Sequence, residues 1–328
     1  MSIPPPAVRA QLLSGVRIAL YLVALAVATA TLAGWTSRWW LPGELACHFR
    51  VQYFWIALAC ALALAAARGP RVAALAAVPA VLNLAVIVPL YWPQAILQIE
   101  RPPLRVASIN VYSRNRRHSD VLKFIADTRP DVVLLLEVTT AWRDLLDALA
   151  VDYPFQKIEL RGDNFGMALF SRVPWESATV HEFGAGGLPS IVASLRWQGE
   201  TVVLLGTHPV PPGGNKMWRL RNEQFAAMAT FCRKQTGAVM LLGDLNSTNW
   251  SAYFGTLLDG TRLRDSRAGF GVQASWPAWS PLPRIAIDHC LVSPEIAVRN
   301  RFIGPDVGSD HFPLVLDLSI DAAAANTR

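Results

Sequence analysis

The chain has few cysteines for its length and no paired cysteine motif. Its 328 residues include four cysteines, and none of them forms a CxxC pair. This scarcity argues against the disulfide framework of small secreted domains and against a cysteine-rich structural zinc site. Cys232 and Cys290 could still pair in an oxidising compartment, and the spacing does not decide this.

Charged residues are also scarce, and their shortage is uneven. They make up 16% of the chain, whereas ordinary soluble domains carry about 25%. Residues 1–100 contain six arginines, no lysine and two acids, and the remainder holds 24 basic and 22 acidic residues. The net charge of +6 therefore arises mainly from the first 100 residues, and it does not indicate the strongly basic face of a polynucleotide-binding protein.

Three long runs of apolar residues lie in the first 100 residues. Residues 18–35, 51–67 and 72–92 contain no charged side chain. At about 1.5 Å per residue each would form a helix close to the roughly 30 Å thickness of a bilayer core. Two further runs follow the first, so a cleaved signal peptide fits poorly. We predict a membrane domain over residues 1–100 with three transmembrane helices.

Arginines flank these runs unevenly. Arg9 and Arg17 precede the first run, and Arg68 and Arg71 lie between the second and third. The positive-inside rule then favours a cytoplasmic N-terminus. With three spans, the rest of this integral membrane protein would be extracytoplasmic.

Residues 101–320 alternate between strand-like and helix-like patterns. Residues 131–138 form a nearly continuous apolar run, as expected of a strand buried on both faces. We predict strands at 104–111, 131–138, 164–170, 190–197, 201–207, 239–242, 284–292 and 313–318, and helices at 119–127, 140–149 and 218–234. Many strands and few helices favour an α/β sheet sandwich covered by helices. The tail 321–328 is expected to be disordered.

Polar side chains recur where the apolar strands end. Each has an ordinary explanation alone, such as a turn residue or a buried structural histidine. A carboxylate that follows a buried strand is nevertheless costly unless a metal or hydrogen bonds compensate it, and strand ends converge at one edge of a sheet. The residues in question are Asn110, Glu137, His208, Asp244, Asn246, Asp288, Asp310 and His311.

Their order resembles that of the endonuclease/exonuclease/phosphatase (DNase I-like) superfamily. The matching blocks are RVASIN, DVVLLLEV, GDNFGMALFSR, LLGTH, LLGDLN, RIAIDHCLV and GSDHFPLVLDL, which span residues 105–318. The resemblance implies a four-layer α-β-β-α sandwich. It also implies an enzyme that hydrolyses phosphate esters with Mg²⁺ or Mn²⁺, by in-line attack of water.

The resemblance implies a role for each matching residue. The metal would be held by Asn110, Glu137 and Asp310. Asp244 would orient the attacking water, and His311, oriented by Asp288, would act as acid/base at the phosphate. The substrate phosphate would be contacted by Asn164, Asn246 and His208.

Two positions depart from the pattern of abasic-site endonucleases within that superfamily. Tyr112 stands where those enzymes carry an acidic residue, and Asn164 stands near the position of their tyrosine. Both departures argue against a role in DNA repair.

The arrangement of three spans before such a domain resembles bacterial membrane proteins of the VanJ type. That resemblance implies a lipid-linked phosphate ester or pyrophosphate as substrate. The alternatives are a membrane-tethered nuclease acting on extracellular DNA or RNA, and a catalytically inactive scaffold.

Two flanking features stay open at this point. The aromatic segment 275–279 (SWPAW) could face the substrate or pack at the domain edge, and the basic segment 114–118 could bind an anion or be solvated.

Overall fold

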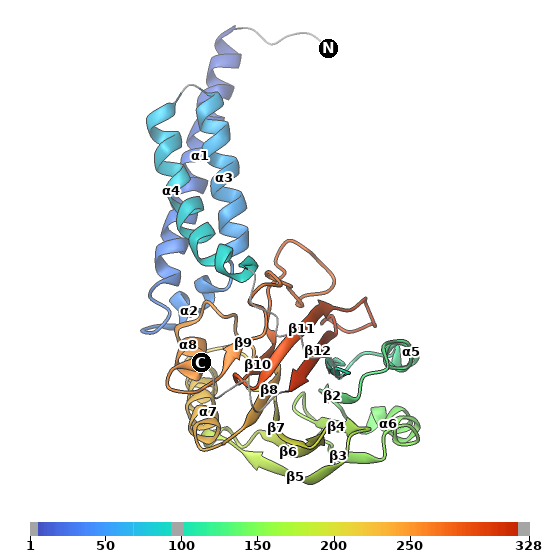
Figure 1. Cartoon of the computed structure of the whole chain (residues 1–328). Coiled ribbons are helices and arrows are strands. Elements are labelled where there is room, and N and C mark those ends of the chain that lie inside the picture. The colour runs from blue at the N-terminus through green and yellow to red at the C-terminus, as the bar shows by residue number, and fades with distance from the viewer. Residues whose placement is uncertain (1–5, 68, 93–101, 321–328) are drawn as a thin grey trace. The chain divides into compact units, whose positions relative to one another are not determined.

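The computed structural model divides into two compact units, Met1–Pro89 and Leu90–Arg328 (Figure 1). The structure describes residues 6–67, 69–92 and 102–320. Residues 93–101 and the predicted disordered tail 321–328 lie outside the described residues.

The first unit is helical throughout. It contains α1 (Pro6–Gly34), α2 (Leu41–Cys47), α3 (Arg50–Ala66) and α4 (Pro70–Ile87), and the short helix η1 (Val88–Tyr91) continues α4. The stretches Ser14–Gly34 and Pro70–Tyr91 are long and apolar enough to cross a membrane. They correspond to the first and third predicted spans.

The second predicted span differs from expectation. Residues 51–67 fall on α3, whose 17 residues are joined to α2 with a bend of 72°. A third span exists only if this bent pair counts as one. The bend was not predicted because hydropathy and charge along the sequence do not indicate where a helix changes direction.

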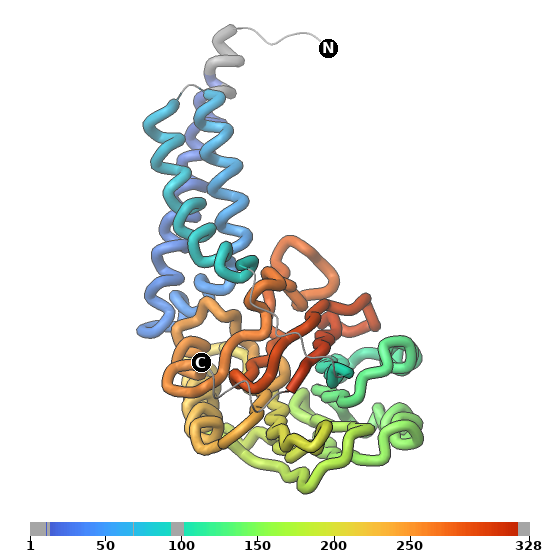
Figure 2. Tube along the Cα trace, viewed as in Figure 1, coloured from blue at the N-terminus to red at the C-terminus, as the bar shows by residue number. Residues whose placement is uncertain are grey.

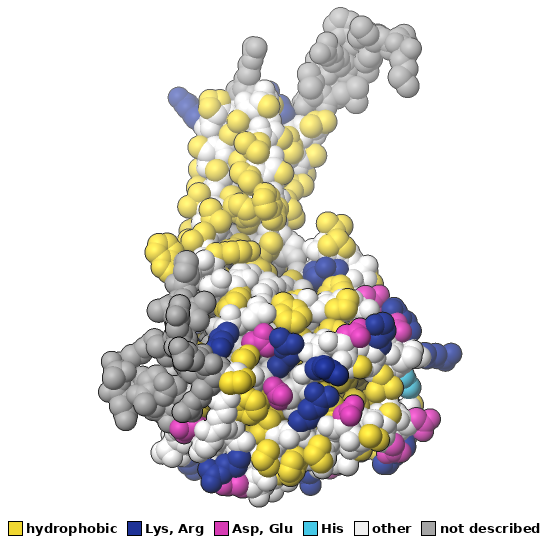
Figure 3. Space-filling model, turned by 45° about the vertical axis from the view of Figure 1, so that its right-hand side comes forward, with side chains coloured by type: hydrophobic (Ala, Val, Ile, Leu, Met, Phe, Trp, Pro, Cys, Tyr) yellow, Lys and Arg dark blue, Asp and Glu magenta, His cyan; other side chains and the backbone are white. Residues whose placement is uncertain are grey.

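Small residues and one polar link hold the helices of this unit together. Ala61, Ala73 and Ala76 pack with Leu64 between α3 and α4, as small residues do where membrane helices approach closely. Asn83 Nδ2 donates to Thr31 Oγ1 at 2.9 Å, and Arg50 Nη1 donates to Asn83 Oδ1 at 3.3 Å. The outer surface of these helices is largely hydrophobic on the face drawn in Figure 3.

The second unit contains two six-stranded sheets. The strand order is β11-β12-β1-β2-β4-β3 in one sheet and β5-β6-β7-β8-β10-β9 in the other. The bounds of the first sheet are β1 (Leu104–Asn110), β2 (Val132–Leu136), β3 (Phe155–Glu159), β4 (Met167–Ser171), β11 (Ile296–Ile303) and β12 (Leu314–Ile320). Those of the second are β5 (Trp175–Glu182), β6 (Pro189–Trp197), β7 (Glu200–Thr207), β8 (Ala238–Asp244), β9 (Arg264–Asp265) and β10 (Asp288–Val292).

Each sheet has one pair of parallel strands at its centre. β1 and β2 are connected through α5 (His118–Thr128), and β7 and β8 through α7 (Asn215–Arg233). A parallel pair needs such a crossover helix, whereas the other pairs are antiparallel. Because the strands of each pair are parallel, their carboxyl ends lie at the same edge of the sheet. The polar residues that follow the apolar runs lie at these ends.

The layers are defined by three apolar cores. One core lies between the two sheets and includes Leu134, Met240 and Leu316. A second joins the first sheet to α5 and α6 (Arg143–Ala150), and a third joins the second sheet to α7 and α8 (Ala252–Leu258). Figure 2 traces the chain through these sheets and helices. The predicted α/β sandwich is therefore confirmed, with helices on both outer faces.

Several observed strands have other bounds than predicted, and some were not predicted. β4 begins at Met167, so Asn164 lies in the preceding loop, and β10 begins at Asp288 rather than at residue 284. β3, β5 and β11 were not predicted, because their half-exposed residues carry no strong apolar run. Cys232 and Cys290 are both buried and free.

Candidate active site

Four polar residues stand at or just beyond the carboxyl ends of the central parallel strands. Asn110 is the last residue of β1 and Asp244 the last of β8, whereas Glu137 and His208 directly follow β2 and β7. All four are at least nine-tenths buried. The crossover topology of the two sheets therefore brings together groups that lie far apart in the sequence.

The Asn110 side chain links the two sheets. Its Nδ2 donates to Glu137 Oε1 at 3.0 Å and to Asp244 Oδ2 at 3.2 Å. Its Oδ1 accepts from the Tyr112 amide at 3.0 Å. A single amide thus spaces two carboxylates that would otherwise repel each other, and it fixes their orientation.

The backbone is strained around this link. Tyr112, Glu137 and Asn246 have φ values of 57°, 64° and 48°, in the left-handed region that side chains other than glycine rarely adopt. Such conformations cost about 1–3 kcal/mol each and tend to cluster at functional sites. Here the turn at Glu137 points its carboxylate back toward β1, where Oε2 accepts from the Ser113 amide at 3.1 Å.

Asp244 lies between two imidazole rings. Its Oδ2 is 3.4 Å from His208 Nε2 and 3.5 Å from His311 Nε2, and its Oδ1 accepts from the Asn246 amide at 2.8 Å. Burial alone would raise the pKa of Asp244, but the His311 charge and the His208 hydrogen bond outweigh burial and lower this pKa to about 2. The group is therefore a carboxylate at neutral pH.

His311 is held from the other side by Asp288. Its Nδ1 is 2.8 Å from Asp288 Oδ2, and Asp288 lies opposite Asp244 in the β8–β10 register. Burial would lower the pKa of His311, yet the charges of Asp288 and Asp244 raise it to about 10. For His208, burial opposes and the Asp244 hydrogen bond favours protonation, and its pKa is raised. The arrangement can thus present protonated imidazoles to an anionic substrate.

Three of the predicted site residues have other contacts. The Asn246 side chain donates to the Pro209 carbonyl at 2.9 Å. Asn164 is exposed and accepts from Ser113 Oγ at 2.8 Å. Asp310 Oδ2 accepts from the Trp276 indole at 3.2 Å. These contacts leave the roles predicted for Asn246, Asn164 and Asp310 as predictions.

The donor set suits a hard divalent cation, although the grouping differs from the expected one. Asp244, Asp288 and His311 form the three-ligand group of this unit within the described residues, with ligand atoms within 4.8 Å of one another. The expected set was Asn110, Glu137 and Asp310. His311 Nδ1 is engaged by Asp288, and carboxylate and amide oxygens are the ligands that Mg²⁺ and Mn²⁺ prefer.

Unmet hydrogen bonds support a ligand at this place. Asp288 Oδ1, Asp310 Oδ1 and His208 Nδ1 are buried and have no hydrogen-bond partner within the described part of the chain. A buried polar atom without a partner costs about 1–3 kcal/mol. A cation or a phosphoryl group would satisfy such atoms.

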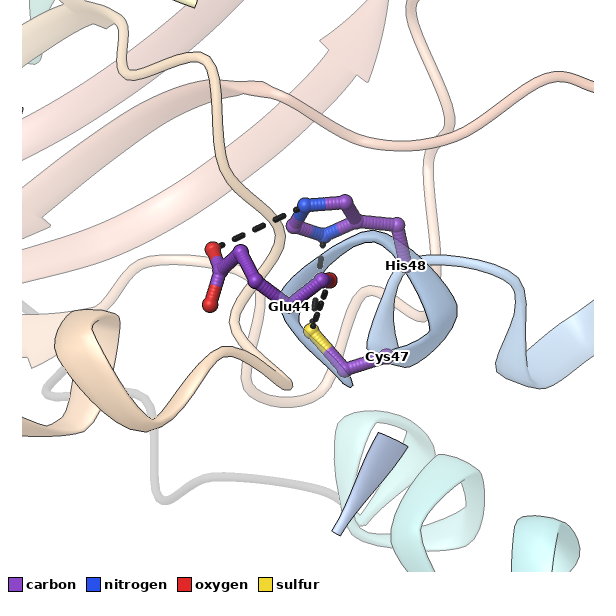
Figure 4. A group of neighbouring side chains, drawn as sticks. All are labelled: Glu44, Cys47 and His48. Carbon is purple, nitrogen blue, oxygen red and sulfur yellow. Dashed lines mark hydrogen bonds and ion pairs between the residues drawn. The ribbon is translucent and has the colours of Figure 1, made fainter. Parts of the chain in front are cut away.

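A second three-ligand group occurs in the helical unit (Figure 4). The Cys47 thiol donates to the Glu44 carbonyl at 3.0 Å and is 3.6 Å from His48 Nδ1. His48 Nε2 is 3.7 Å from Glu44 Oε1. The group lies at the bend between α2 and α3, and its three ligand atoms are within 4.8 Å of one another.

Two supporting residues, Ser309 and Arg301, were missed from the sequence, and a third, Trp276, lies in the segment 275–279 whose role the sequence left open. Ser309 Oγ donates to the Asn110 carbonyl at 2.6 Å and accepts from the His311 amide at 3.0 Å. Trp276 contacts Asp310, and Arg301 Nη2 donates to the Asp288 carbonyl at 3.2 Å. The serine within GSDH was the available signal, whereas the other two contacts depend on the tertiary fold.

A two-sheet sandwich with a buried carboxylate–histidine cluster at the ends of its central strands defines the class of protein. The sequence matches the model of the Endonuclease/Exonuclease/phosphatase family over residues 107–311. The chain belongs to this family, which comprises hydrolases of phosphate esters.

Similar proteins have several different substrates. Inositol phosphosphingolipids phospholipase C of Saccharomyces cerevisiae is 29% identical over 141 residues, which cover 36% of this chain and 30% of the yeast protein. D. rerio TDP2 in complex with a single-strand DNA product has a TM-score of 0.56 at 18% identity, covering 66% of this chain and 98% of that chain. The human Nocturnin catalytic domain with bound sulfate has a TM-score of 0.54 at 19% identity, covering 67% and 94%. At these identities the structural likeness shows the fold alone.

Proposed function

We propose that this chain is a membrane-anchored, divalent-metal-dependent phosphoesterase that hydrolyses a lipid-linked phosphate ester or pyrophosphate. The observation that carries the proposal is the Asn110 bridge between Glu137 and Asp244, beside the His311–Asp288 pair. These five residues belong to the hydrolytic set that the resemblance to the family implies, and their contacts support the proposal. An inactive scaffold has no reason to retain it.

The chain's own residues would divide the chemistry as follows. Asp244, ionised at neutral pH, would accept a hydrogen bond from the attacking water and orient it. His311 would donate from Nε2 to a phosphoryl oxygen, with Asp288 accepting from Nδ1 and holding the protonated ring in place. His208 would donate to the same group as negative charge develops in the transition state.

Glu137 would be the main ligand of the Mg²⁺ or Mn²⁺ ion, supported by Asn110 and Asp310. When bound, the ion would act as a Lewis acid and as a template for in-line displacement. Asn246 and Asn164 would contact the substrate phosphate after leaving their present hydrogen-bond partners.

A lipid-linked substrate is supported by two observations. Two helices are long and apolar enough to cross a bilayer, so the enzyme would meet lipid head groups at high effective concentration. The yeast relative is named as a phospholipase C of inositol phosphosphingolipids. We further propose an extracytoplasmic catalytic unit, because four arginines flank the apolar runs on one side and two on the other. We also propose a VanJ-type member, because apolar helices precede the catalytic unit as they do in that type.

A panel of substrates tests the proposal. The purified full chain would be assayed on a lipid pyrophosphate, a sphingomyelin-like diester and DNA, each with Mg²⁺ and with EDTA. We expect Mg²⁺-dependent hydrolysis of a lipid substrate. Preferential cleavage of DNA would favour the nuclease alternative, and no hydrolysis in any condition would favour a scaffold.

A further inference from the structure

The segment between β9 and β10 presents two large apolar side chains to solvent. Trp279 and Leu282 are 76% and 80% exposed. Among the described residues from 104 onward, the other exposed large hydrophobics are Val151 and Met217. Two of these four side chains therefore lie in one turn, within the long orange segment of Figure 2 that has little regular secondary structure.

The base of this turn is held rigidly. The Ala278 amide donates to the Asp310 carbonyl at 2.7 Å. Arg284 donates from Nε to the Pro277 carbonyl at 3.0 Å and from Nη2 to the Ala278 carbonyl at 2.8 Å. The guanidinium lies over the Phe312 ring at 4.6 Å. The apolar tip is thus presented by an ordered support, and little conformational entropy remains to be lost when it binds.

The residues at the base of the turn also contact the edge that carries the candidate active site. The Trp276 indole donates to Asp310, and Asp310 immediately precedes His311. A surface that contacts the turn would therefore also lie close to the edge where substrate must enter.

Cationic side chains emerge from two other loops of this edge. Arg114 and Arg116 lie in the loop after β1, and Lys216 lies at the start of α7, after the loop that follows His208; all three are exposed. None of the three forms an ion pair with an acidic side chain in the part of the chain that the structure describes. Met217, 47% exposed, is next to Lys216.

We propose that this edge is a bilayer-contacting surface that seats the active site on membranes containing anionic lipids. The surface, called here the docking edge, consists of Trp279, Leu282, Met217, Arg114, Arg116 and Lys216. This inference rests on the proposed membrane anchoring and lipid-linked substrate, and it adds how the site reaches that substrate.

Apolar and cationic groups together are the usual signature of a surface that contacts an anionic interface. Tryptophan is favoured at the head-group level, and leucine and methionine gain by entering the acyl region. A polynucleotide would match the cations and could stack on Trp279, but it would leave Leu282 and Met217 in water. The apolar pair therefore favours a bilayer over nucleic acid.

Site-directed fluorescence tests the contact without reference to catalysis. All four native cysteines are buried, so a bimane label would react selectively at Leu282→Cys, with Val151→Cys as the matched exposed control. The full chain would be reconstituted in vesicles of phosphatidylcholine and phosphatidylglycerol that carry doxyl-labelled lipid. We expect quenching at position 282, weaker quenching without phosphatidylglycerol, and none at position 151.

Each result separates this inference from the proposed function. A chain that floats with vesicles and hydrolyses lipid, but shows no quenching at position 282, would overturn the docking edge and leave the function standing. A chain that does not associate with vesicles would overturn both. Quenching of position 282 by added DNA rather than by lipid would replace the bilayer with a nucleic-acid partner.

A kinetic comparison adds a functional readout. We expect Trp279→Ser/Leu282→Ser to lower the ratio of kcat/KM on a vesicle-embedded substrate to that on a soluble phosphodiester by about tenfold. Val151→Ser should leave this ratio unchanged. An equal fall on both substrates would show that the turn acts in folding or in the chemistry itself, and the docking edge would be rejected.

Discussion

Replacement of Asp288 by asparagine should disable His311 while leaving the fold in place. The asparagine side chain has nearly the same shape, and the Asp288 carbonyl would still accept from Arg301. Only the negative charge next to His311 Nδ1 would be lost. The variant therefore isolates the electrostatic part of the pair.

The size of the effect follows from the distance between the two side chains. Two unit charges 2.8 Å apart attract by about 6 kcal/mol at an effective dielectric constant of about 20. Losing half of this attraction would lower the pKa of His311 by about two units. The pKa of His311, raised to about 10 by Asp288 and Asp244 against the effect of burial, should fall substantially.

Two changes should appear in the kinetics. kcat on a soluble phosphodiester with Mn²⁺ should fall by about a hundredfold or more, because a positioned acid or base contributes about 10²–10⁴ in rate. A raised pKa keeps His311 protonated well above neutral pH. In the variant the proton is lost earlier, and the activity loss at alkaline pH should move to lower pH by about two units.

The control is another carboxylate engaged in an ion pair, in the same unit. Asp317 accepts from Arg105 Nε at 2.7 Å, and Asp317→Asn should alter stability without moving the pH profile. Asp288→Asn with the kcat and the alkaline limb of the native protein would refute the role assigned to the pair.

Three other outcomes are expected. Glu137→Gln should weaken Mn²⁺ binding by about tenfold or more, measured by calorimetry, and unchanged affinity would exclude Glu137 as a ligand. Burial and the nearby Arg267 lower the pKa of His289 to about 3, so between pH 7 and pH 5 the unfolded chain takes up a proton at this residue and the folded chain does not. The contribution of His289 to stability should therefore fall by about 2 kcal/mol over this range. Thermal unfolding of His289→Gln at several pH values should lack this part of the pH dependence. Gly243→Ala should destabilise by about 3 kcal/mol, because a Cβ there would lie 2.0 Å from the Thr207 carbonyl oxygen at φ 145°; in chemical unfolding, Gly255→Ala, which meets nothing within 4 Å, should be neutral or stabilising.

The parts of the fold that the sequence predicts are those buried on both faces. β2 and β8 are apolar over most of their length and fully buried, and each run ends at a polar residue that marks the edge of its sheet. β5 contains only half-buried and exposed positions, and β11 mixes buried, half-buried and exposed positions, so no continuous apolar pattern distinguishes them from loops. A strand that is buried on both faces is therefore the easiest to predict, because it requires a continuous apolar run in the sequence.

The helical unit shows the corresponding limit for helices. Hydropathy identifies apolar runs, but it carries no information on where a run is bent. The bend between α2 and α3 lies where buried Glu44 and His48 contact each other and where Arg50 reaches Thr31 and Asn83 on two other helices. The contacts of Arg50 join residues distant in sequence, and a window of hydropathy cannot anticipate them.

The candidate site shows why polar residues at strand ends are informative even without a partner in view. The carboxylate of Asp244 is compensated by Asn110, His208 and His311, which come from both sheets and from the loop before β12. A partner for each carboxylate could be expected on energetic grounds, because an uncompensated buried charge costs several kcal/mol. Which partner it is depends on the topology. Three atoms of the candidate site, Asp288 Oδ1, Asp310 Oδ1 and His208 Nδ1, are buried and have no hydrogen-bond partner among the described residues. Because a buried polar atom without a partner is costly, the cation and the phosphoryl group of the proposed function would supply what these atoms lack.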